Sequence, residues 1–167
     1  MSDYLEFIGL SHKIVGIDLD PVAMGAEDAD KNILVEIGDQ ADVKFLDSIA
    51  KKYGAFDVII DDGSHVCKHQ YASFNCLFEH LKSGGIYIVE DVCTSYWPEY
   101  NEHGSFSMVE FCKTLVDDVN FFGITTGNTL DRNENAIIEH IMSNRLNINT
   151  SISSMQFFNS TILIYKR

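Results

Sequence analysis

The sequence predicts an α/β fold in which helices cover both faces of a mostly parallel sheet. Short apolar runs that end in acidic residues alternate with segments of helical periodicity. The apolar runs are continuous rather than alternating, which is typical of strands buried on both faces. Strand and helix in regular alternation is the order of a doubly wound parallel sheet. At 167 residues the chain has the length of one domain, and we expect a single domain over residues 1–167.

Four strands are expected in the first part of the chain. They cover residues 13–20, 33–39, 56–62 and 85–91, and each ends in acid. Ligands of such sheets bind beyond the carboxyl ends of the strands. A single acidic cluster there is explained equally well by a solvated loop. Four clusters at four successive strand ends favour a binding site along one edge of the sheet.

The helices and the last strands follow from periodicity and turn residues. Residues 41–54 predict a helix that stops at Gly54, and residues 68–85 predict one that stops at Gly84 and Gly85. Residues 105–122 predict a helix capped by Ser105 or Ser107. Residues 131–146 predict a shorter helix or a partly ordered loop, within a segment, 123–149, whose role as a lid is open. Residues 153–167 predict an antiparallel hairpin that turns at positions 159 and 160.

Composition and charge exclude several classes of protein. With 46% hydrophobic residues and 2 prolines the chain is globular rather than disordered. No apolar run is long enough to cross a bilayer and no signal peptide is visible, so we expect a cytoplasmic protein. The net charge of −13 argues against nucleic acid and against an anionic membrane as partners. It is compatible with a neutral or cationic ligand, or with a divalent cation.

The cysteines do not indicate a metal site. Cys67, Cys76, Cys93 and Cys112 have no zinc-type spacing. In a cytoplasmic protein we expect them to be reduced and to serve as small buried apolar residues.

The first two acidic clusters have the residue types of a nucleotide site. Asp18, with Asp20 behind it, could accept both hydroxyls of a ribose at the tip of its strand. The pair of aspartates also resembles those of haloacid dehalogenase-type phosphatases and of metal-using glycosyltransferases. Asp39 and Gln40 could meet the edge of an adenine with an acceptor and a donor. A helix N-cap at Asp39 or Asp42 is an equally good interpretation.

The third and fourth clusters have the residue types of a metal site with a base beside it. Asp62, Glu90 and Asp91 could bring oxygen ligands to one point, which suits an octahedral Mg²⁺. His65 follows Asp62 after a glycine and would lie beside the cation. A cation lowers the pKa of a bound hydroxyl, and a neutral imidazole can then take the proton. The alternative for His65 is an ordinary loop histidine, and the orientation of Asp61 is open.

Four stretches resemble a known family. They are GIDLDP, GDQADVKFLDSIAKKYGAFDVIIDDGSH, GGIYIVEDVCTSYW and SSMQFFNSTILIYKR. They look like the S-adenosylmethionine-dependent, Mg²⁺-dependent sugar O-methyltransferases of macrolide biosynthesis and their relatives in polysaccharide decoration. The resemblance covers residues 13–97 well and the last fifteen residues moderately. It implies a Rossmann-like three-layer αβα fold, with a mostly parallel sheet and a C-terminal antiparallel hairpin.

The resemblance also assigns roles to residues. It implies that Asp62, Glu90 and Asp91 bind Mg²⁺ and that His65 is the general base. It further implies that S-adenosylmethionine is met by Asp18, Asp39, Gln40 and Asp62. Tyr96 and Trp97 would form an apolar wall for the sugar, for which ordinary core packing is the alternative.

The beginning of the chain departs from the family pattern. The family opens with a strand and a glycine-rich cofactor loop, whereas here a short segment precedes residues 13–20. Residues 2–10 are interpreted as the remnant of a helix rather than as that strand, because parallel strands need a longer crossover. We therefore expect the usual first strand and its loop to be missing. An unpaired central edge would be adhesive, so we expect a homo-oligomer or a partner that supplies the strand.

Two functions remain open from the sequence. The first is methyl transfer from S-adenosylmethionine to a hydroxyl of a sugar or sugar-containing small molecule, assisted by Mg²⁺ and by His65. The second is a catalytically inactive, methyltransferase-like fragment or scaffold subunit that needs a partner or a swapped strand. Phosphoryl chemistry on Asp18 and Asp20 is a weaker third hypothesis, because basic residues that could hold phosphate are sparse.

Overall fold

The computed structural model describes residues 12–120 and 151–167. The chain divides into two compact units, Met1–Tyr53 and Gly54–Arg167, and each is considered by itself. The segments 2–10, 131–146 and 123–149, for which the sequence suggested a helix remnant, a helix and a lid, lie outside the described residues. Among the described residues no helix is both long enough and apolar enough to span a membrane.

The first unit is a parallel strand pair with one helix. Its elements are β1 (Ile14–Asp18), η1 (Pro21–Ala26), β2 (Ile33–Ile37) and α2 (Val43–Tyr53). β1 and β2 pair in parallel from Ile14 opposite Ile33 to Asp18 opposite Ile37. The two strands predicted here from their apolar runs are confirmed, each slightly shorter than its sequence pattern.

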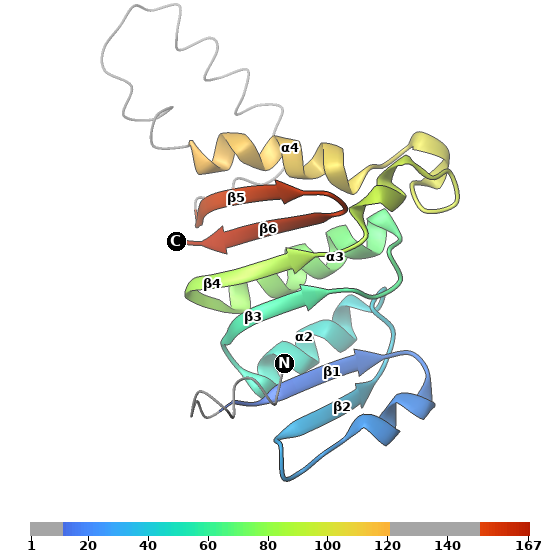
Figure 1. The fold of residues 1–167 in the computed structure, drawn as a ribbon, viewed down its shortest axis with the longest axis vertical. Coiled ribbons are helices and arrows are strands. Elements are labelled where there is room, and N and C mark those ends of the chain that lie inside the picture. Colours follow the sequence, from blue (N-terminus) through green and yellow to red (C-terminus); the bar gives the residue numbers. More distant parts are fainter. Residues whose placement is uncertain (1–11, 121–150) are drawn as a thin grey trace, which may run out of the picture. The chain divides into compact units, whose positions relative to one another are not determined.

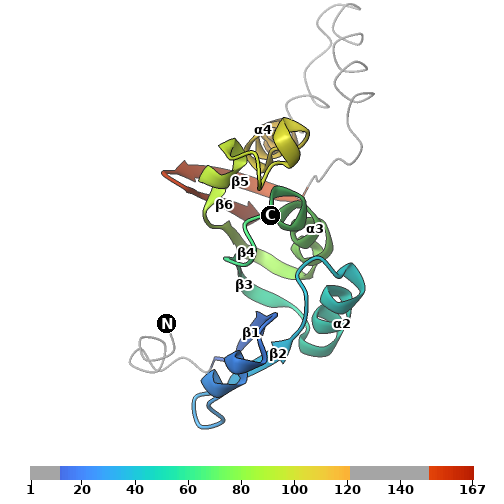
Figure 2. The same ribbon diagram turned by 90° about the vertical axis from the view of Figure 1, so that its right-hand side faces the viewer.

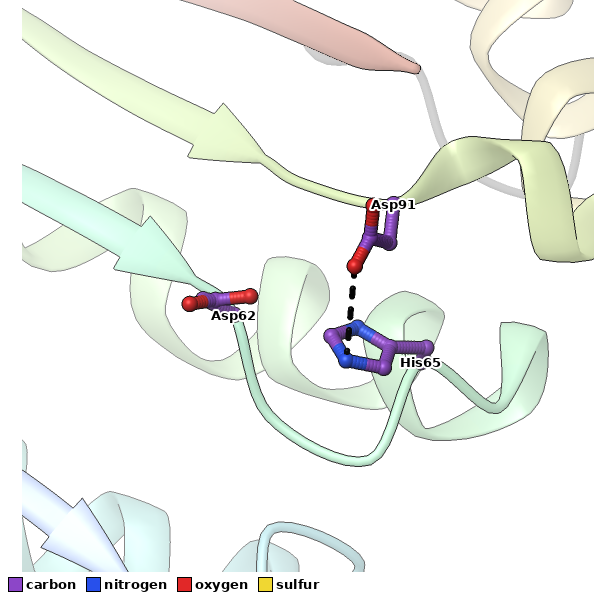
Figure 3. A group of neighbouring side chains, drawn as sticks. All are labelled: Asp62, His65 and Asp91. Carbon is purple, nitrogen blue, oxygen red and sulfur yellow. Dashed lines mark ion pairs between the residues drawn. The ribbon is translucent and has the colours of Figure 1, made fainter.

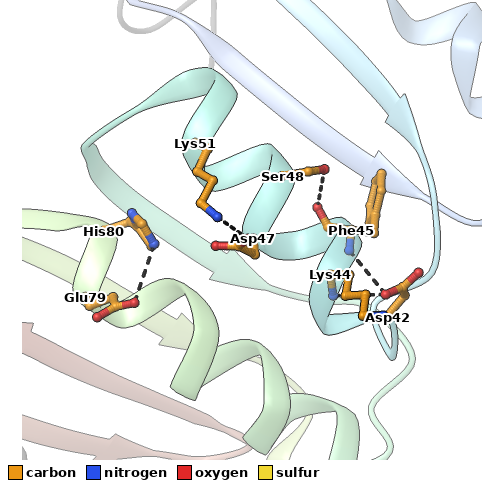
Figure 4. A network of polar contacts seen from close by, with 8 residues as sticks. All are labelled: Asp42, Lys44, Phe45, Asp47, Ser48, Lys51, Glu79 and His80. Carbon is orange, nitrogen blue, oxygen red and sulfur yellow. Dashed lines mark hydrogen bonds and ion pairs between the residues drawn. The ribbon is translucent and has the colours of Figure 1, made fainter.

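Helix α2 begins and ends where its sequence signals predicted. The Asp42 carboxylate accepts hydrogen bonds from the backbone N–H groups of Lys44, at 2.9 Å, and Phe45, at 3.2 Å (Figure 4). Asp42 therefore satisfies two N–H groups that have no partner within the helix. Beyond the last turn Gly54 has a φ of +77°, a left-handed conformation that glycine adopts without strain.

The second unit is a four-stranded mixed sheet with two α-helices. Its strands are β3 (Phe56–Asp61), β4 (Leu81–Val89), β5 (Ile152–Phe158) and β6 (Thr161–Lys166). Its helices are α3 (Cys67–Leu77), η2 (Phe78–His80), η3 (Val92–Tyr96), η4 (Glu102–Gly104) and α4 (Met108–Val119). The strand order is β3-β4-β6-β5, with β3 and β4 parallel and the remaining pairs antiparallel (Figure 1). The predicted C-terminal hairpin is confirmed.

The core of this unit lies between the sheet and α3, which runs along one face of it (Figure 2). Phe74 and Phe78 meet Tyr87 of β4, with ring centroids 5.3 and 6.5 Å from it. α4 packs beside β5 and buries Met108 and Leu115. This burial of large apolar and aromatic side chains supplies the main driving force for folding of the unit.

The predicted end of α3 was wrong. The helix ends at Leu77, and Gly84 and Gly85 lie inside β4. There Gly84 has a φ of +78°, and a Cβ on Gly85 would lie 2.9 Å from the Lys82 carbonyl oxygen. The glycines therefore accommodate an irregularity in the β3–β4 register and do not end the helix.

Two smaller predictions are settled in this unit. Ser107 rather than Ser105 caps α4, because its hydroxyl accepts the N–H of Glu110. All four cysteines are free thiols; Cys67 and Cys112 are buried as expected, whereas Cys76 and Cys93 are only half-buried.

Candidate functional site

The candidate site lies beyond the carboxyl ends of β3 and β4. These parallel neighbours are in register, with Asp61 opposite Val89 at their last paired positions. The N–H of Glu90 donates to the Asp61 carbonyl at 2.9 Å, which extends the pairing by one step. The segments that follow the two strands therefore leave the sheet side by side, as the sequence predicted from their acidic endings.

Asp62, His65 and Asp91 converge at this edge. Each offers one ligand atom, and these atoms all lie within 4.8 Å of one another. Figure 3 shows the Asp91 carboxylate aimed at the imidazole, with 3.7 Å between His65 Nε2 and Asp91 Oδ2. His65 Nδ1 is buried and has no hydrogen-bond partner among the described residues. Nε2 is therefore the ring nitrogen that can meet a ligand at the acidic edge.

The turn that carries Asp91 is fixed by the C-terminal hairpin. Asp91 has a left-handed backbone, with a φ of +49°. The Ser160 hydroxyl, at the tip of the β5–β6 hairpin, donates to Asp91 Oδ1 at 3.4 Å. The Val92 N–H donates to the Ser160 carbonyl at 3.1 Å. Ser160 was expected from the sequence as a turn position but not as a site residue, since nothing in its neighbourhood signals a contact with a residue so distant in the chain.

The donor set fits a hard divalent cation. Asp62 and Asp91 are exposed and His65 is half-buried, so two carboxylates face solvent around one imidazole. Carboxylate oxygens are the ligands that Mg²⁺ prefers, and it commonly keeps several waters beside one or two of them. Exposed acidic groups also occur without a metal, so the cluster defines the chemistry of a candidate site rather than its occupancy.

Glu90 is not a member of this group. Its carboxylate is not among the atoms that come within 4.8 Å of one another. Its carbonyl oxygen accepts a hydrogen bond from Nε2 of the buried Gln70 at 2.9 Å, which fixes the backbone just before Asp91. The assignment of Glu90 as a metal ligand stays a prediction.

Asp61 points into the core. It is 5% exposed, and its Oδ2 accepts a hydrogen bond of 3.2 Å from the hydroxyl of the fully buried Tyr87. Burial, together with the neighbouring Asp61 carboxylate, raises the pKa of Tyr87 well above its ordinary value. The sequence left open whether Asp61 faces the site or the core. The Asp61 side chain is buried against Tyr87, whereas Asp62 faces the site.

Tyr96 and Trp97 are on the surface. Their exposed fractions are 69% and 50%, so ordinary core packing does not explain them. The Trp97 ring packs edge-on against Tyr100, with centroids 5.8 Å apart. The exposed side chains of Tyr96 and Trp97 are therefore accessible to a ligand.

The nucleotide-binding candidates belong to the first unit. Asp18 ends β1, and its Oδ1 accepts the Asp20 N–H at 2.8 Å, while Asp20 caps η1. Asp39 follows β2, and its Oδ1 accepts the Ala41 N–H at 2.8 Å. Gln40 comes next and is half-buried. The helix-cap interpretation is therefore correct for Asp42 but not for Asp39, which makes a turn of its own.

Rossmann-like methyltransferases have a mixed sheet with antiparallel last strands and an acidic cluster beyond the parallel ones, as the second unit does. Comparison with solved structures confirms the fold. The chain matches the MycE methyltransferase of the mycinamycin pathway, solved with Mg and SAH, with a TM-score of 0.72 and 29% identity over 92% of this chain and 36% of that chain. A second MycE structure, which also contains mycinamycin VI, gives a TM-score of 0.69.

The curated relatives confirm the resemblance to sugar O-methyltransferases of macrolide pathways. The mycinamicin VI 2''-O-methyltransferase of Micromonospora griseorubida is 44% identical over 87 residues, which are 49% of this chain and 22% of that protein. The demethylmacrocin O-methyltransferase of Streptomyces fradiae is 41% identical over 111 residues, which are 64% of this chain and 27% of that protein. The chain thus matches about a quarter of each relative's length. No family model matches it.

Proposed function

We propose that the chain carries the acceptor-side and metal-binding part of an S-adenosylmethionine-dependent sugar O-methyltransferase. The observation that carries this proposal is the convergence of Asp62, His65 and Asp91 beyond two adjacent parallel strands. The similarity to macrolide sugar O-methyltransferases supports a sugar hydroxyl as the acceptor. The MycE complex with Mg, SAH and mycinamycin VI supports the same cofactors and a glycosylated small molecule as substrate.

The roles of the residues follow from their positions. Asp62 and Asp91 would hold Mg²⁺, with Glu90 as the third ligand that the resemblance implies. The cation would lower the pKa of the acceptor hydroxyl. His65 would take the proton of the acceptor hydroxyl at Nε2, as that oxygen bonds to the methyl group and S-adenosylhomocysteine leaves. The imidazolium that forms is stabilised by the Asp91 carboxylate, whose Oδ2 lies 3.7 Å from Nε2.

The cofactor assignments concern the first unit. We propose that Asp18 accepts the ribose hydroxyls and that Asp39 and Gln40 contact the adenine, whereas the cofactor contact of Asp62, which belongs to the second unit, stays a prediction. The support for this is that Asp18 and Asp39 lie at the carboxyl ends of the parallel strands β1 and β2, where ligands of such sheets bind.

The test is a titration followed by a rate measurement. S-adenosylhomocysteine is titrated calorimetrically into the 167-residue chain with and without Mg²⁺, and methyl transfer to mycinamycin VI is then measured. Replacing His65 by Ala should reduce turnover by about 10²- to 10⁴-fold, because a general base is lost, while the affinity for S-adenosylhomocysteine changes little. His80→Ala is the matched control, because His80 also lies 3.7 Å from a carboxylate, that of Glu79.

Three outcomes are informative. Unchanged turnover in His65→Ala would remove the base assignment. Binding of Mg²⁺ without S-adenosylhomocysteine would favour the non-catalytic scaffold over the enzyme. Binding of neither would contradict the proposed site for this chain.

We also propose that the chain associates with a second copy or with a partner strand along β3. Among the described residues β3 pairs with β4 alone, and its Val58 and Ile60 are 44% and 42% exposed. Unpaired strands with apolar side chains favour pairing with another chain. We further propose that the protein is cytoplasmic, where its four free thiols would stay reduced.

A further inference from the structure

Two residues of the acidic cluster have backbones that ordinary residues rarely adopt. His65 has a φ of +57° and Asp91 a φ of +49°. A left-handed backbone at a residue other than glycine costs about 1–3 kcal/mol, so it persists only where the surrounding structure holds it. The directions of the imidazole and the carboxylate depend on these two conformations. The contacts of the two carbonyl groups therefore matter for the geometry of the site.

One buried hydroxyl contacts both carbonyl groups. Thr94 lies in η3 and is 3% exposed. Its Oγ1 is 2.8 Å from the His65 carbonyl oxygen and 2.9 Å from the Asp91 carbonyl oxygen. His65 and Thr94 are 29 positions apart in the sequence, so the contact joins the loop after β3 to the turn after β4.

The hydroxyl hydrogen is needed at His65. A threonine hydroxyl has one hydrogen to donate. The Asp91 carbonyl already accepts a hydrogen bond of 3.1 Å from the Thr94 backbone N–H. Among the described residues, the His65 carbonyl accepts a hydrogen bond from the Thr94 hydroxyl alone. Loss of this hydrogen bond would leave the His65 carbonyl without a donor, and an unsatisfied buried acceptor costs about 1–3 kcal/mol of folding free energy.

We propose that Thr94 is a positioning residue, whose hydroxyl ties the His65 loop to the Asp91 turn and so sets the distance between the imidazole and the two carboxylates. This proposal rests on the proposed function, because the metal-binding measurement below presumes the Mg²⁺ site proposed there. Partners that orient ligands in this indirect way typically contribute 10- to 100-fold to metal affinity.

A local capping role would be the simpler explanation, and the chain offers a control for it. A threonine hydroxyl often bonds the carbonyl three positions earlier in a helical turn. Thr114 does this in α4, with its Oγ1 2.7 Å from the Phe111 carbonyl, and it is exposed. Thr114→Ala therefore removes a local bond of the same kind without touching the site.

The experiment compares Thr94→Ala with Thr94→Ser, which keeps the hydroxyl and loses the same methyl group. Affinity for Mn²⁺ is measured from the free-ion signal in electron paramagnetic resonance, and the imidazole of His65 is followed by NMR in the metal-free chain. We expect Thr94→Ala to bind Mn²⁺ about tenfold more weakly than the unchanged chain. Thr94→Ser should recover most of that loss, and Thr114→Ala should bind normally.

Each remaining outcome decides the question. Equal Mn²⁺ affinity in Thr94→Ala, or an equal loss in Thr94→Ser, would overturn the proposal. If the unchanged chain binds no Mn²⁺, the metal site of the proposed function fails and the NMR spectrum alone decides. In that case a His65 signal displaced in Thr94→Ala but not in Thr94→Ser supports Thr94, and an undisplaced signal overturns its role. If Thr94→Ala does not fold, Thr94→Val replaces it, and failure of both to fold would assign the hydroxyl to stability instead.

Discussion

Asp61 and Asp62 are adjacent carboxylates with opposite surroundings. Successive side chains of a strand point to opposite faces, so Asp61 meets the buried Tyr87 hydroxyl while Asp62 is exposed beside His65. The sequence assigned Asp62 to a site at this strand end but left open whether Asp61 also faces it. The orientation of Asp61 depends on which face of the sheet α3 covers, and that is decided by tertiary packing.

The buried Tyr87 leads to a prediction about stability at high pH. Its pKa in the folded chain lies well above the ordinary value of about 10, so between those two values the folded state keeps a proton that the unfolded state loses. The stability contributed by Tyr87 is therefore complete below pH ~10 and declines as pH rises further. We expect Tyr87→Phe to lose less stability than the unchanged chain above pH 10, by up to about 1.4 kcal/mol for each pH unit.

The measurement is urea-induced unfolding at several values between pH 9 and 11. Near neutral pH the variant should be less stable by about 1–3 kcal/mol, since Asp61 loses a buried hydrogen bond. Tyr96→Phe is the control, because the Tyr96 side chain is 69% exposed. Parallel pH profiles for all three chains would contradict the prediction.

The left-handed conformations of His65 and Asp91 could not be foreseen from the sequence. Neither residue is glycine, and although Asp62 and Gly63 are typical of a turn, they do not indicate that His65 takes the left-handed conformation. Their backbones are held by Thr94 and by Ser160, which come from η3 and from the distant hairpin. The residue types of the site were therefore predictable from the sequence, but its geometry was not.

At the scale of elements, Gly38 lets α2 pack against the end of β2. A Cβ on Gly38 would overlap the ring of Phe45. Gly38→Ala should therefore force the ring or the backbone to move and should lower the free energy of unfolding by about 1–3 kcal/mol, the usual cost of overpacking. Thermal or urea unfolding followed by circular dichroism measures this change.

Two further variants test the cause of that change. Gly25→Ala, in η1, should be tolerated, because nothing lies within 4 Å of its added Cβ. Phe45→Ala should make the Gly38 substitution nearly neutral, because the overlapping ring is gone. A Gly38→Ala chain as stable as the unchanged one would show that the ring moves freely.

Most elements were predictable because their signals are local. Strands β1 to β4 were predicted from apolar runs that end in acidic residues. Helix α2 begins after Asp42 and ends before Gly54, as expected. The end of α3 was not predictable, because Gly84 and Gly85 are typical of a helix stop and of a strand irregularity alike. Which of the two occurs is decided by the pairing of β4 with β3.

At the scale of the whole molecule, the pairing proposed along β3, which among the described residues pairs with β4 alone, predicts association. We expect the mean sedimenting mass to rise above that of one chain as the concentration increases. Val58→Lys should reduce this association, because it places a charge on an exposed apolar position of the edge strand. Val116→Lys is the control, since Val116 is 45% exposed but lies on α4. A monomer at every concentration would contradict self-association and leave a partner strand as the alternative.

The order of the strands also determines when the site can form during folding. β6 lies between β4 and β5 in the sheet although it follows both in the chain, so β5 cannot be joined to the sheet until β6 exists. We expect β5 and β6 to form first as a local hairpin, which then docks on β4. Ser160 reaches Asp91 only at that step, so the turn that carries Asp91 takes its final form only after the hairpin has docked.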